Sequence, residues 1–207
     1  MEKRAITLNA ILGTTTMLCG LVAAPLVTLG LMPWFPGWPV WTPGLIGAGM
    51  AVLSAAVYAR FAADPAWAAW WWLAVIGTVL GLIDTWHHRL PHPWLTILAI
   101  GGVTMLGAAR PELIGRLIGA SLLVLAFGLL VQWAMPGEVG FGDTLLLAAL
   151  APFWAWHGWT TVLAGLTTAH LMLGAFAGLA WLSGLRKPST RIAAGPGLVL
   201  GAWIPLL

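Results

Sequence analysis

Two aspartates stand at positions where a carboxylate is unusual. The chain of 207 residues has only six Asp and Glu side chains in total. Asp84 closes the apolar run 74–83, and Asp143 follows a Gly-Phe-Gly triplet immediately before another apolar run. Acids beside lipid are costly, so both are candidates for function. The structural alternative is that Asp143 caps the helix that begins there and that Asp84 is an acid at a helix end near the interface.

Two carboxylates that share a site permit the mechanism of an aspartic protease. Because like charges in one site cannot both ionise cheaply, one member stays protonated, and the pair titrates as a unit. The ionised member takes a proton from a water molecule that attacks the scissile carbonyl, while the protonated member donates to the carbonyl oxygen. Gly140 and Gly142 have no side chains, so an extended peptide could approach the backbone beside Asp143 closely.

Histidines are the other residues that could do chemistry. Three follow Asp84 closely: His87, His88 and His92. Adjacent histidines point apart in a helix and two prolines interrupt this segment, so we expect polar loop residues, with no metal ion and no cofactor. His170, inside an apolar run, is either a functional group or a neutral histidine bonded to a neighbouring helix. The single cysteine, Cys19, excludes an internal disulfide and a multi-cysteine zinc site.

Composition indicates the kind of protein that must position these residues. Hydrophobic residues make up 60% of the chain and charged residues 7%, against roughly 25% charged in a soluble domain. Several runs approach the roughly 20 apolar residues that span a bilayer as a helix. The 15 tryptophans often stand near the ends of these runs, as interfacial anchoring predicts. We expect an all-α polytopic membrane protein. It has no basic cluster of the kind that binds nucleic acid.

Breaks at proline, glycine and charge predict about eight transmembrane helices in a single domain, 1–207. The expected spans are 7–31, 43–60, 67–84, 93–109, 115–134, 143–157, 159–183 and 193–207. The first is longer than the apolar core of a typical signal peptide, so we expect it to be retained. After Asp84 the chain crosses twice and re-enters at Asp143, which predicts that both acids face the same membrane surface. Lysines and arginines are nearly balanced between the two surfaces, so loop charge leaves the orientation open.

The two aspartate segments together resemble the type IV prepilin peptidase family, which are polytopic membrane aspartic proteases of the GxGD type. The family closes one span with an aspartate and places a proline seven residues later, as Asp84 and Pro91 do. Its second aspartate follows Gly-x-Gly at the start of a span, as in 140–143. A weaker similarity is the Gly-Pro turn in 192–198, which resembles the turn that opens the family's last span. The resemblance covers roughly residues 43–207.

This resemblance implies a membrane aspartic endopeptidase that removes the leader peptide of type IV prepilin-like precursors. Asp84 and Asp143 would be the catalytic dyad, with Gly140 and Gly142 supporting the substrate. Glu138 is either a solvated loop acid or a contact for the basic leader of the substrate. The implied location is a bacterial plasma membrane, with the active site facing the cytoplasm. The implied partners are prepilin or pseudopilin precursors, the bilayer, and assembly proteins of a pilus or secretion system.

The chain departs from the family pattern in two places. Many members carry a cysteine-rich cytoplasmic insertion associated with N-methylation, whereas 32–42 is short and has no cysteine, which puts N-methyltransferase activity in doubt. Many also have a lysine two residues after the second aspartate, where this chain has Leu145. These departures keep a second class open. In that class the chain is a non-enzymatic membrane transporter, or an inactive pilus or secretion assembly factor, and the acids relay protons or cations.

Overall fold

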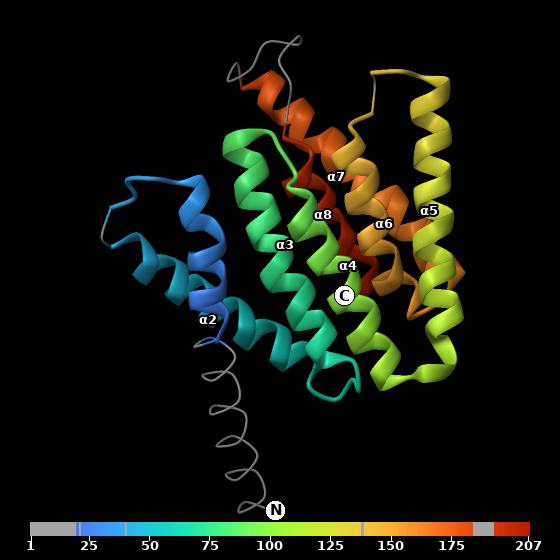
Figure 1. The fold of residues 1–207 in the computed structure, drawn as a ribbon, viewed down its shortest axis with the longest axis horizontal. Helices are drawn as coiled ribbons and strands as arrows, with labels where there is room; N and C mark the ends of the chain where they lie inside the picture. The colour runs from blue at the N-terminus through green and yellow to red at the C-terminus, as the bar shows by residue number, and fades with distance from the viewer. Residues whose placement is uncertain (1–19, 21, 40, 138, 184–192) are drawn as a thin grey trace, which may run out of the picture. The chain divides into compact units, whose positions relative to one another are not determined.

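Helices account for all regular secondary structure in the part of the chain that the structure describes. The computed structural model describes residues 20, 22–39, 41–137, 139–183 and 193–207. The elements are an apolar helix Val22–Trp34 that ends in the 3₁₀ turn η1 (Met32–Trp34), α2 (Thr42–Phe61), α3 (Trp67–His87), α4 (His92–Ala109), η2 (Pro111–Leu113), α5 (Ile114–Ala134), α6 (Phe141–Ala155), α7 (Trp159–Leu182), α8 (Gly195–Trp203) and η3 (Ile204–Leu206). The all-α prediction is therefore confirmed (Figure 1).

Five of these helices are long and apolar enough to cross a bilayer. They are α2, α3, α4, α5 together with η2, and α7. The helices Val22–Trp34, α6 and α8 with η3 are apolar but shorter than a full span. The chain is therefore a multi-pass membrane protein with five candidate spans among the described residues. The prediction of about eight spans is confirmed for these five and stays a prediction for the others.

Helix ends follow the local signals, with two informative differences. Prolines stand in the first turn of α2, α4 and α8, where a missing N–H costs nothing because it has no helical partner. α3 continues to His87, beyond the expected end at residue 84, and His88 then takes a positive φ of 50° that stops the helix. α6 begins at Phe141, two residues earlier than expected. Asp84 therefore lies in the last turn of α3, and Asp143 lies in the first turn of α6.

Contacts divide the chain into two compact units, unit 1 (Met1–Val79) and unit 2 (Leu80–Leu207). In unit 1, α2 and the first part of α3 are joined by a hydrogen bond of 2.9 Å from the Trp71 indole N–H to the Ser54 hydroxyl. The rings of Phe61 and Trp70 add a contact, with centroids 5.4 Å apart. These contacts fix two consecutive helices against each other within that unit.

Unit 2 is built around α6. This helix packs against α4, α5, α7 and α8, and its residues from Leu146 to Ala155 are buried (Figure 1). Polar bonds reinforce the packing: the Trp154 indole N–H donates to the Ala202 carbonyl at 3.0 Å, and the Ser121 hydroxyl donates to the Ala148 carbonyl at 2.6 Å. α7 and α8 approach closely at Gly201, where a Cβ atom would lie 2.6 Å from Cα of Ala169. A short central helix is thus held on all sides, so the residues of its first turn have defined positions.

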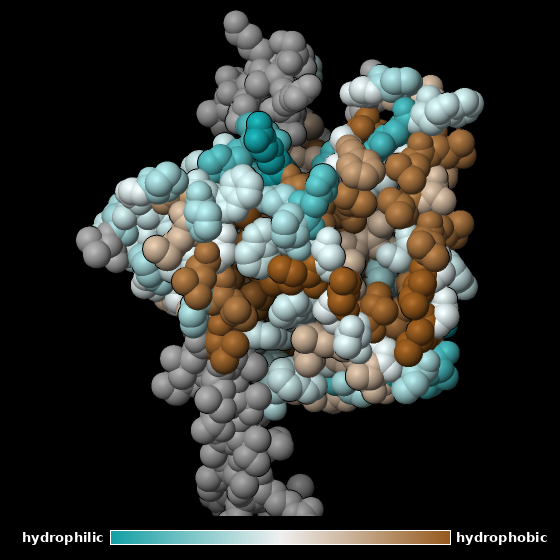
Figure 2. Space-filling view, viewed as in Figure 1, coloured by the Kyte–Doolittle hydropathy of each residue, from teal (hydrophilic) through white to brown (hydrophobic). Residues whose placement is uncertain are grey.

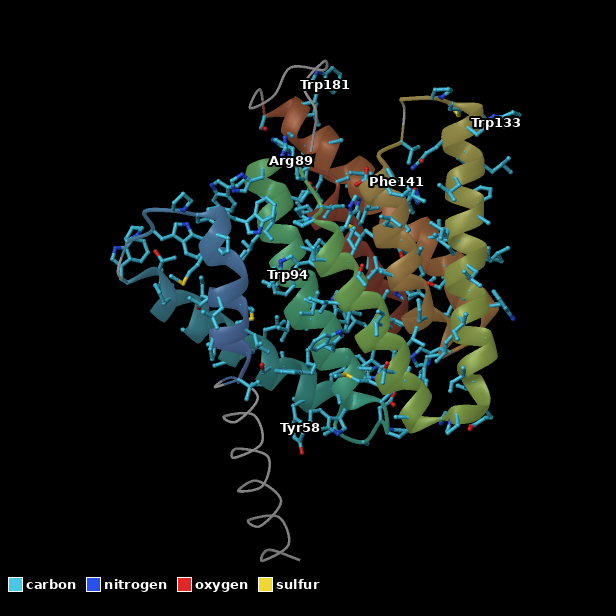
Figure 3. All side chains as sticks on the ribbon, viewed as in Figure 1. Tyr58, Arg89, Trp94, Trp133, Phe141 and Trp181 are labelled. Atoms are coloured by element: carbon cyan, nitrogen blue, oxygen red, sulfur yellow. The ribbon has the colours of Figure 1, made fainter. Side chains whose placement is uncertain are left out.

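The outer face of α5 is apolar. Along this helix Leu122, Phe127 and Leu130 are each more than half exposed, at 60%, 62% and 57%. Figure 2 shows the hydrophobic colour following α5 along the edge of the molecule, and Figure 3 shows Trp133 near one end of the helix. Soluble proteins rarely expose so many large apolar side chains on one helix, whereas a helix that faces lipid does so.

Candidate functional site

Asp84 lies in the last turn of α3 and is only 5% exposed. The backbone N–H of Gly195, the first residue of α8, donates a hydrogen bond of 2.7 Å to its Oδ2 atom. The Ala194 amide is a second donor toward the same carboxyl group. A buried carboxyl group is stable only when such donors replace water. The turn at the start of α8 therefore provides the polar environment of Asp84.

Gly195 lets the backbone at the start of α8 come close to the acid. A Cβ atom at Gly195 would lie 3.0 Å from both Cβ and Oδ2 of Asp84. The neighbouring residue Pro196 approaches Gly81, one turn earlier on α3, with 3.9 Å between its Cα and a Cβ built there. The sequence singled out this Gly-Pro turn only as a weak similarity, and Gly195 itself was not predicted as a site residue.

Asp143 occupies the third position of α6 and is not the N-cap of the helix. The N-cap is Gly140, whose φ of −71° and ψ of 138° are extended, and whose carbonyl accepts the amide N–H of Thr144 at 3.2 Å. The capping interpretation of Asp143 is therefore wrong, because the helix has already begun at Phe141. Instead, the Gly140 N–H is a donor to the Asp143 carboxyl group, which folds back over the turn as the acid of a capping box does.

The loop between α3 and α4 and the first residue of α4 pack against the first turn of α6. Gly142 faces Leu90 of this loop, and a Cβ atom at Gly142 would lie 3.1 Å from Cβ of Leu90. The His92 and Phe141 rings meet edge to face, with centroids 5.8 Å apart. Figure 3 shows Arg89 and Phe141 at the same end of unit 2. At this end the carboxyl groups of Asp84 and Asp143 are close enough to interact electrostatically.

Gln132, which the sequence analysis did not single out, holds the turn that carries Asp143. Its Nε2 atom donates to Oγ1 of Thr144 at 2.7 Å and to the carbonyl oxygen of Gly140 at 3.3 Å. These two acceptors stand on either side of Asp143 in the sequence. The sequence signal that could have identified Gln132 is a single amide side chain in the last turn of α5, a helix that is otherwise almost entirely apolar.

The remaining candidates lie elsewhere or outside the described residues. His87 and His88 are exposed, and Leu145 is half-buried. Within the described ranges, no three His, Cys, Asp or Glu side chains are grouped so as to hold a metal ion. Glu138 lies outside the residues that the structure describes, as does Cys19.

His170 faces the site from α7. Its Nδ1 atom bonds the carbonyl oxygen of Leu166, one turn earlier in the same helix, at 2.7 Å. The ring is also close enough to Asp143 to interact with it electrostatically. The expectation that His170 bonds to a neighbouring helix is wrong for Nδ1, because this nitrogen bonds a carbonyl oxygen of its own helix.

Comparisons of the chain with protein-family models, curated proteins and solved structures found no match. A function is therefore inferred from the arrangement of the residues. Two carboxyl groups from different helices share one end of unit 2, each with a glycine amide as donor, and a histidine ring stands beside one of them. Such a group of residues can hold and move protons at a bound water or at a polarised carbonyl.

Proposed function

We propose that the chain is a membrane aspartic endopeptidase that cleaves the leader peptide of type IV prepilin-like precursors with Asp84, Asp143 and water. The observation that carries the proposal is the placement of these two acids, which are far apart in the sequence and lie on different helices, at the same end of unit 2 and near enough for their charges to interact. The paired motifs that resemble the prepilin peptidase family support it from the sequence side. The transmembrane character of the chain agrees with a substrate that is itself held in the membrane.

The hydrogen bonds suggest how the dyad works. The Gly195 N–H donates to Oδ2 of Asp84 and the Ala194 amide is a second donor to this carboxyl group, so the start of α8 orients the acid. One acid, ionised, removes a proton from the water that attacks the scissile carbonyl. The other, protonated, donates to the carbonyl oxygen, and the two exchange roles as the amine leaves. Because Asp84 is buried, the charges act at low dielectric, where each interaction is stronger than in water.

The substrate in this proposal is a small membrane-inserted precursor with a short basic leader and an apolar helix. Its scissile segment would lie extended against Gly140 and Gly142, at the cytoplasmic face of a bacterial plasma membrane. Assembly proteins of a pilus or secretion system would receive the product. No cofactor takes part in this chemistry.

The test is co-expression with a prepilin and comparison of matched Asp→Asn variants. Asp84→Asn and Asp143→Asn should each abolish leader removal while the protein remains in the membrane. Asp64→Asn is the control, because Asp64 lies outside the site and accepts the Ala66 amide through Oδ1, an oxygen that asparagine keeps. Full cleavage by either site variant would exclude the dyad. A solute flux that depends on Asp84 without proteolysis would instead favour a transporter, and neither activity would favour an inactive assembly factor.

A further inference from the structure

Two arginines converge on Trp156, the C-cap residue of α6. Nη2 of Arg116, in the first turn of α5, donates a hydrogen bond of 2.9 Å to the Trp156 carbonyl oxygen. The guanidinium carbon of Arg110, the residue before η2, lies 5.0 Å from the centroid of the Trp156 ring. Trp156 itself is only 5% exposed. Two positive charges from different segments are therefore held beside one buried side chain.

The charges of these arginines are not balanced by an acid. Among the described residues neither guanidinium group forms an ion pair with a carboxylate, and Nε of Arg116 is buried without a hydrogen-bond acceptor. The bond to Trp156 explains Arg116, because a cation at the carboxyl end of a helix satisfies its last carbonyl groups. It does not explain a second arginine over the same residue. Since like charges repel unless an anion lies near both, the pair indicates a site for an anion.

This site lies at a membrane surface. η2 joins α4 to α5 at the end of unit 2 opposite to the turn that carries Asp143 (Figure 1). Trp159 begins α7 at the same end and is 48% exposed, as a tryptophan at the level of the lipid headgroups is expected to be. The anion that the bilayer itself presents at this level is the lipid phosphate, which arginine binds through parallel N–H donors.

An apolar strip leads from Arg116 along α5 into the bilayer. Leu123 and Phe127 follow Arg116 at nearly whole helical turns, so the three share one face, and they are 58% and 62% exposed. Gly119 lies between them, and a Cβ atom there would meet nothing within 4 Å. At the rise of an α-helix, Arg116 and Phe127 are roughly 17 Å apart, close to the roughly 15 Å of hydrocarbon in one leaflet. An acyl chain of a lipid bound at Arg116 would therefore end near Phe127.

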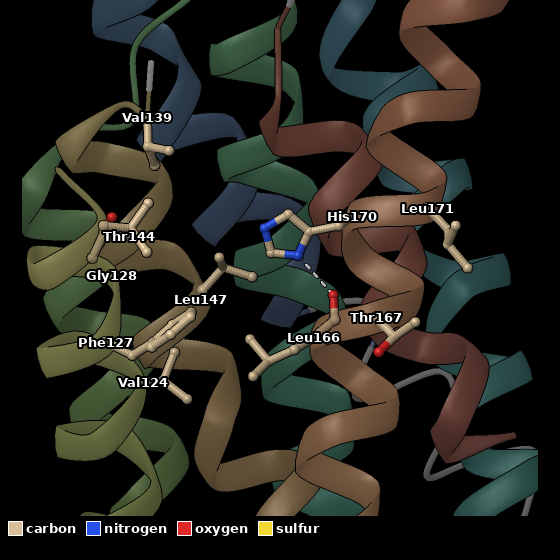
Figure 4. A pocket seen from close by; sticks show the side chains of 11 residues that line it. Val124, Phe127, Gly128, Val139, Thr144, Leu147, Leu166, Thr167, His170 and Leu171 are labelled. Carbon is tan, nitrogen blue, oxygen red and sulfur yellow. Dashed lines mark hydrogen bonds between the residues drawn. The ribbon is translucent and has the colours of Figure 1, made fainter. Parts of the chain in front are cut away.

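Phe127 also lines a cavity of about 460 Å³ between α5, α6 and α7, within unit 2 (Figure 4). Its walls are largely apolar, and Leu171 on the α7 side is 67% exposed, so the cavity is open to the lipid. His170, the one titratable residue in its described lining, bonds the Leu166 carbonyl of its own helix through Nδ1. Water does not fill a hollow with such walls, because it needs several polar partners, whereas a hydrocarbon chain does not.

We propose that unit 2 binds one anionic phospholipid. Arg110 and Arg116 hold its phosphate, and one acyl chain lies along Leu123 and Phe127 with its end in the cavity. The site lies at the other end of unit 2 from the two acids and does not depend on the proposed function. Phosphatidylglycerol, whose phosphate carries its only charge, fits the arginines. Phosphatidylcholine brings a cation beside them and is disfavoured.

The first test measures the preference for an anionic headgroup. The full chain in detergent is titrated with phosphatidylglycerol and phosphatidylcholine of the same acyl chains, and native mass spectrometry counts the bound lipid. Phosphatidylglycerol should bind at least about 5-fold more tightly, and Arg110→Gln should lower its affinity by about 5-fold without affecting phosphatidylcholine. Arg110→Gln is informative because it leaves the bond between Arg116 and Trp156 in place.

Arg60→Gln is the matched control. Arg60 also lies over a ring, that of Phe61 at 5.1 Å, but the described residues of unit 1 contain no second lysine or arginine. Its replacement should leave both affinities unchanged. Equal affinity of the wild-type protein for the two lipids, or equal losses in Arg60→Gln and Arg110→Gln, overturns the site.

Glycerol phosphate in excess separates a lipid site from a site for a soluble phosphate. It carries the charge without acyl chains, so it should displace little of the bound phosphatidylglycerol. Complete displacement would assign the arginines to a soluble phosphate compound and overturn the lipid proposal.

A photoreactive group near the end of one acyl chain tests the path of that chain. Phosphatidylglycerol with this group is a minor component of phosphatidylcholine vesicles that contain the protein, and cross-links are mapped after irradiation. They should gather on Phe127 and Leu171 and decrease in Arg110→Gln. Thr167→Trp, at an exposed lining position, should reduce them, whereas Leu163→Trp, 67% exposed and outside the described lining, should not. Cross-links spread evenly over the exposed apolar residues of all helices overturn the ordered chain.

Discussion

The side-chain amide of Gln132 donates a 2.7 Å hydrogen bond to the hydroxyl group of Thr144, the residue that follows Asp143. The same amide nitrogen lies 3.3 Å from the carbonyl oxygen of Gly140, which caps α6. One side chain from α5 thus holds both ends of the turn in which Asp143 sits. The position of this acid therefore depends on a neighbouring helix as well as on its own.

Gln132→Leu should lower kcat for precursor cleavage by about 10-fold or more and raise KM, because the turn that carries Asp143, Gly140 and Gly142 loses its anchor. Initial rates over a range of precursor concentrations measure both constants. Ser121→Ala is the control, since Ser121 joins the same two helices by a 2.6 Å bond to Ala148 farther from the site. It should cost about 1 kcal/mol of stability and leave kcat unaltered. A similar loss of kcat in both variants would mean that Gln132 acts only through helix packing.

Gly195→Ala should reduce cleavage by about 10-fold, because the added methyl group shifts the Asp84 carboxyl group slightly and catalysis is sensitive to the placement of a catalytic group. The new methyl group would lie 3.0 Å from Oδ2 of Asp84 and displace the acid from its amide partner. Cleavage of a prepilin in membranes gives the rate, and membrane content is checked by immunoblot. Gly174→Ala on α7, where a Cβ atom meets nothing within 4 Å, should have no effect. Normal activity of Gly195→Ala would show that the close contact is not needed for function.

Gly128→Ala should destabilise the protein by about 1–3 kcal/mol, because an added Cβ atom would overlap Cγ2 of Thr144 on the facing helix. Thr144→Ser removes Cγ2 and keeps the hydroxyl group that Gln132 binds. The double variant should therefore recover part of the lost stability. Unfolding midpoints in detergent, compared for the four proteins of this cycle, measure the coupling. Strictly additive effects would argue against direct contact between residues 128 and 144.

Ser54→Ala should cost about 1–3 kcal/mol, because the Trp71 indole N–H loses its acceptor in a partly buried setting. Trp71→Phe in the Ser54→Ala background removes the unsatisfied donor as well. The second substitution should then cost less than it does in the wild-type protein. Reversible unfolding in mixed micelles gives the change in the free energy of unfolding for each single variant and for the double variant. This prediction concerns unit 1 alone and is independent of any enzymatic activity.

Local signals in the sequence located most of the helices. Proline and glycine breaks between apolar runs predicted α2, α4 and α5 to within one residue at either end. The predicted end of α3 at residue 84 is three residues early. The residue whose positive φ stops the helix is His88, and a histidine is not the glycine or asparagine that usually indicates such a position. The predicted start of α6 at residue 143 is two residues late, because the helix follows the N-cap Gly140 directly and its first turn contains the aspartate.

In the candidate site, the sequence predicted the two acids but not the residues that hold them. Asp84 and Asp143 stand out in the sequence because acids are rare in apolar surroundings, and the number of spans between them predicts a common face. Gly195 and Gln132 act through contacts between helices that no local pattern records. A backbone amide of glycine that binds a carboxyl group does not change the periodicity of the side chains. A single glutamine at a helix end is common in proteins and does not by itself indicate a site.

The bond between Gly195 and Asp84 joins residues 111 positions apart, and this has a consequence for the order of synthesis. Asp84 enters the membrane with α3, but its amide donor is made only after α4 to α7 have followed. During this interval the acid has neither the Gly195 N–H nor the burial that α8 provides. Chains fold progressively as they emerge, so maturation of the site waits for the last helix of unit 2. For the proposed peptidase, this order of synthesis means that cleavage begins only after α8 has been made.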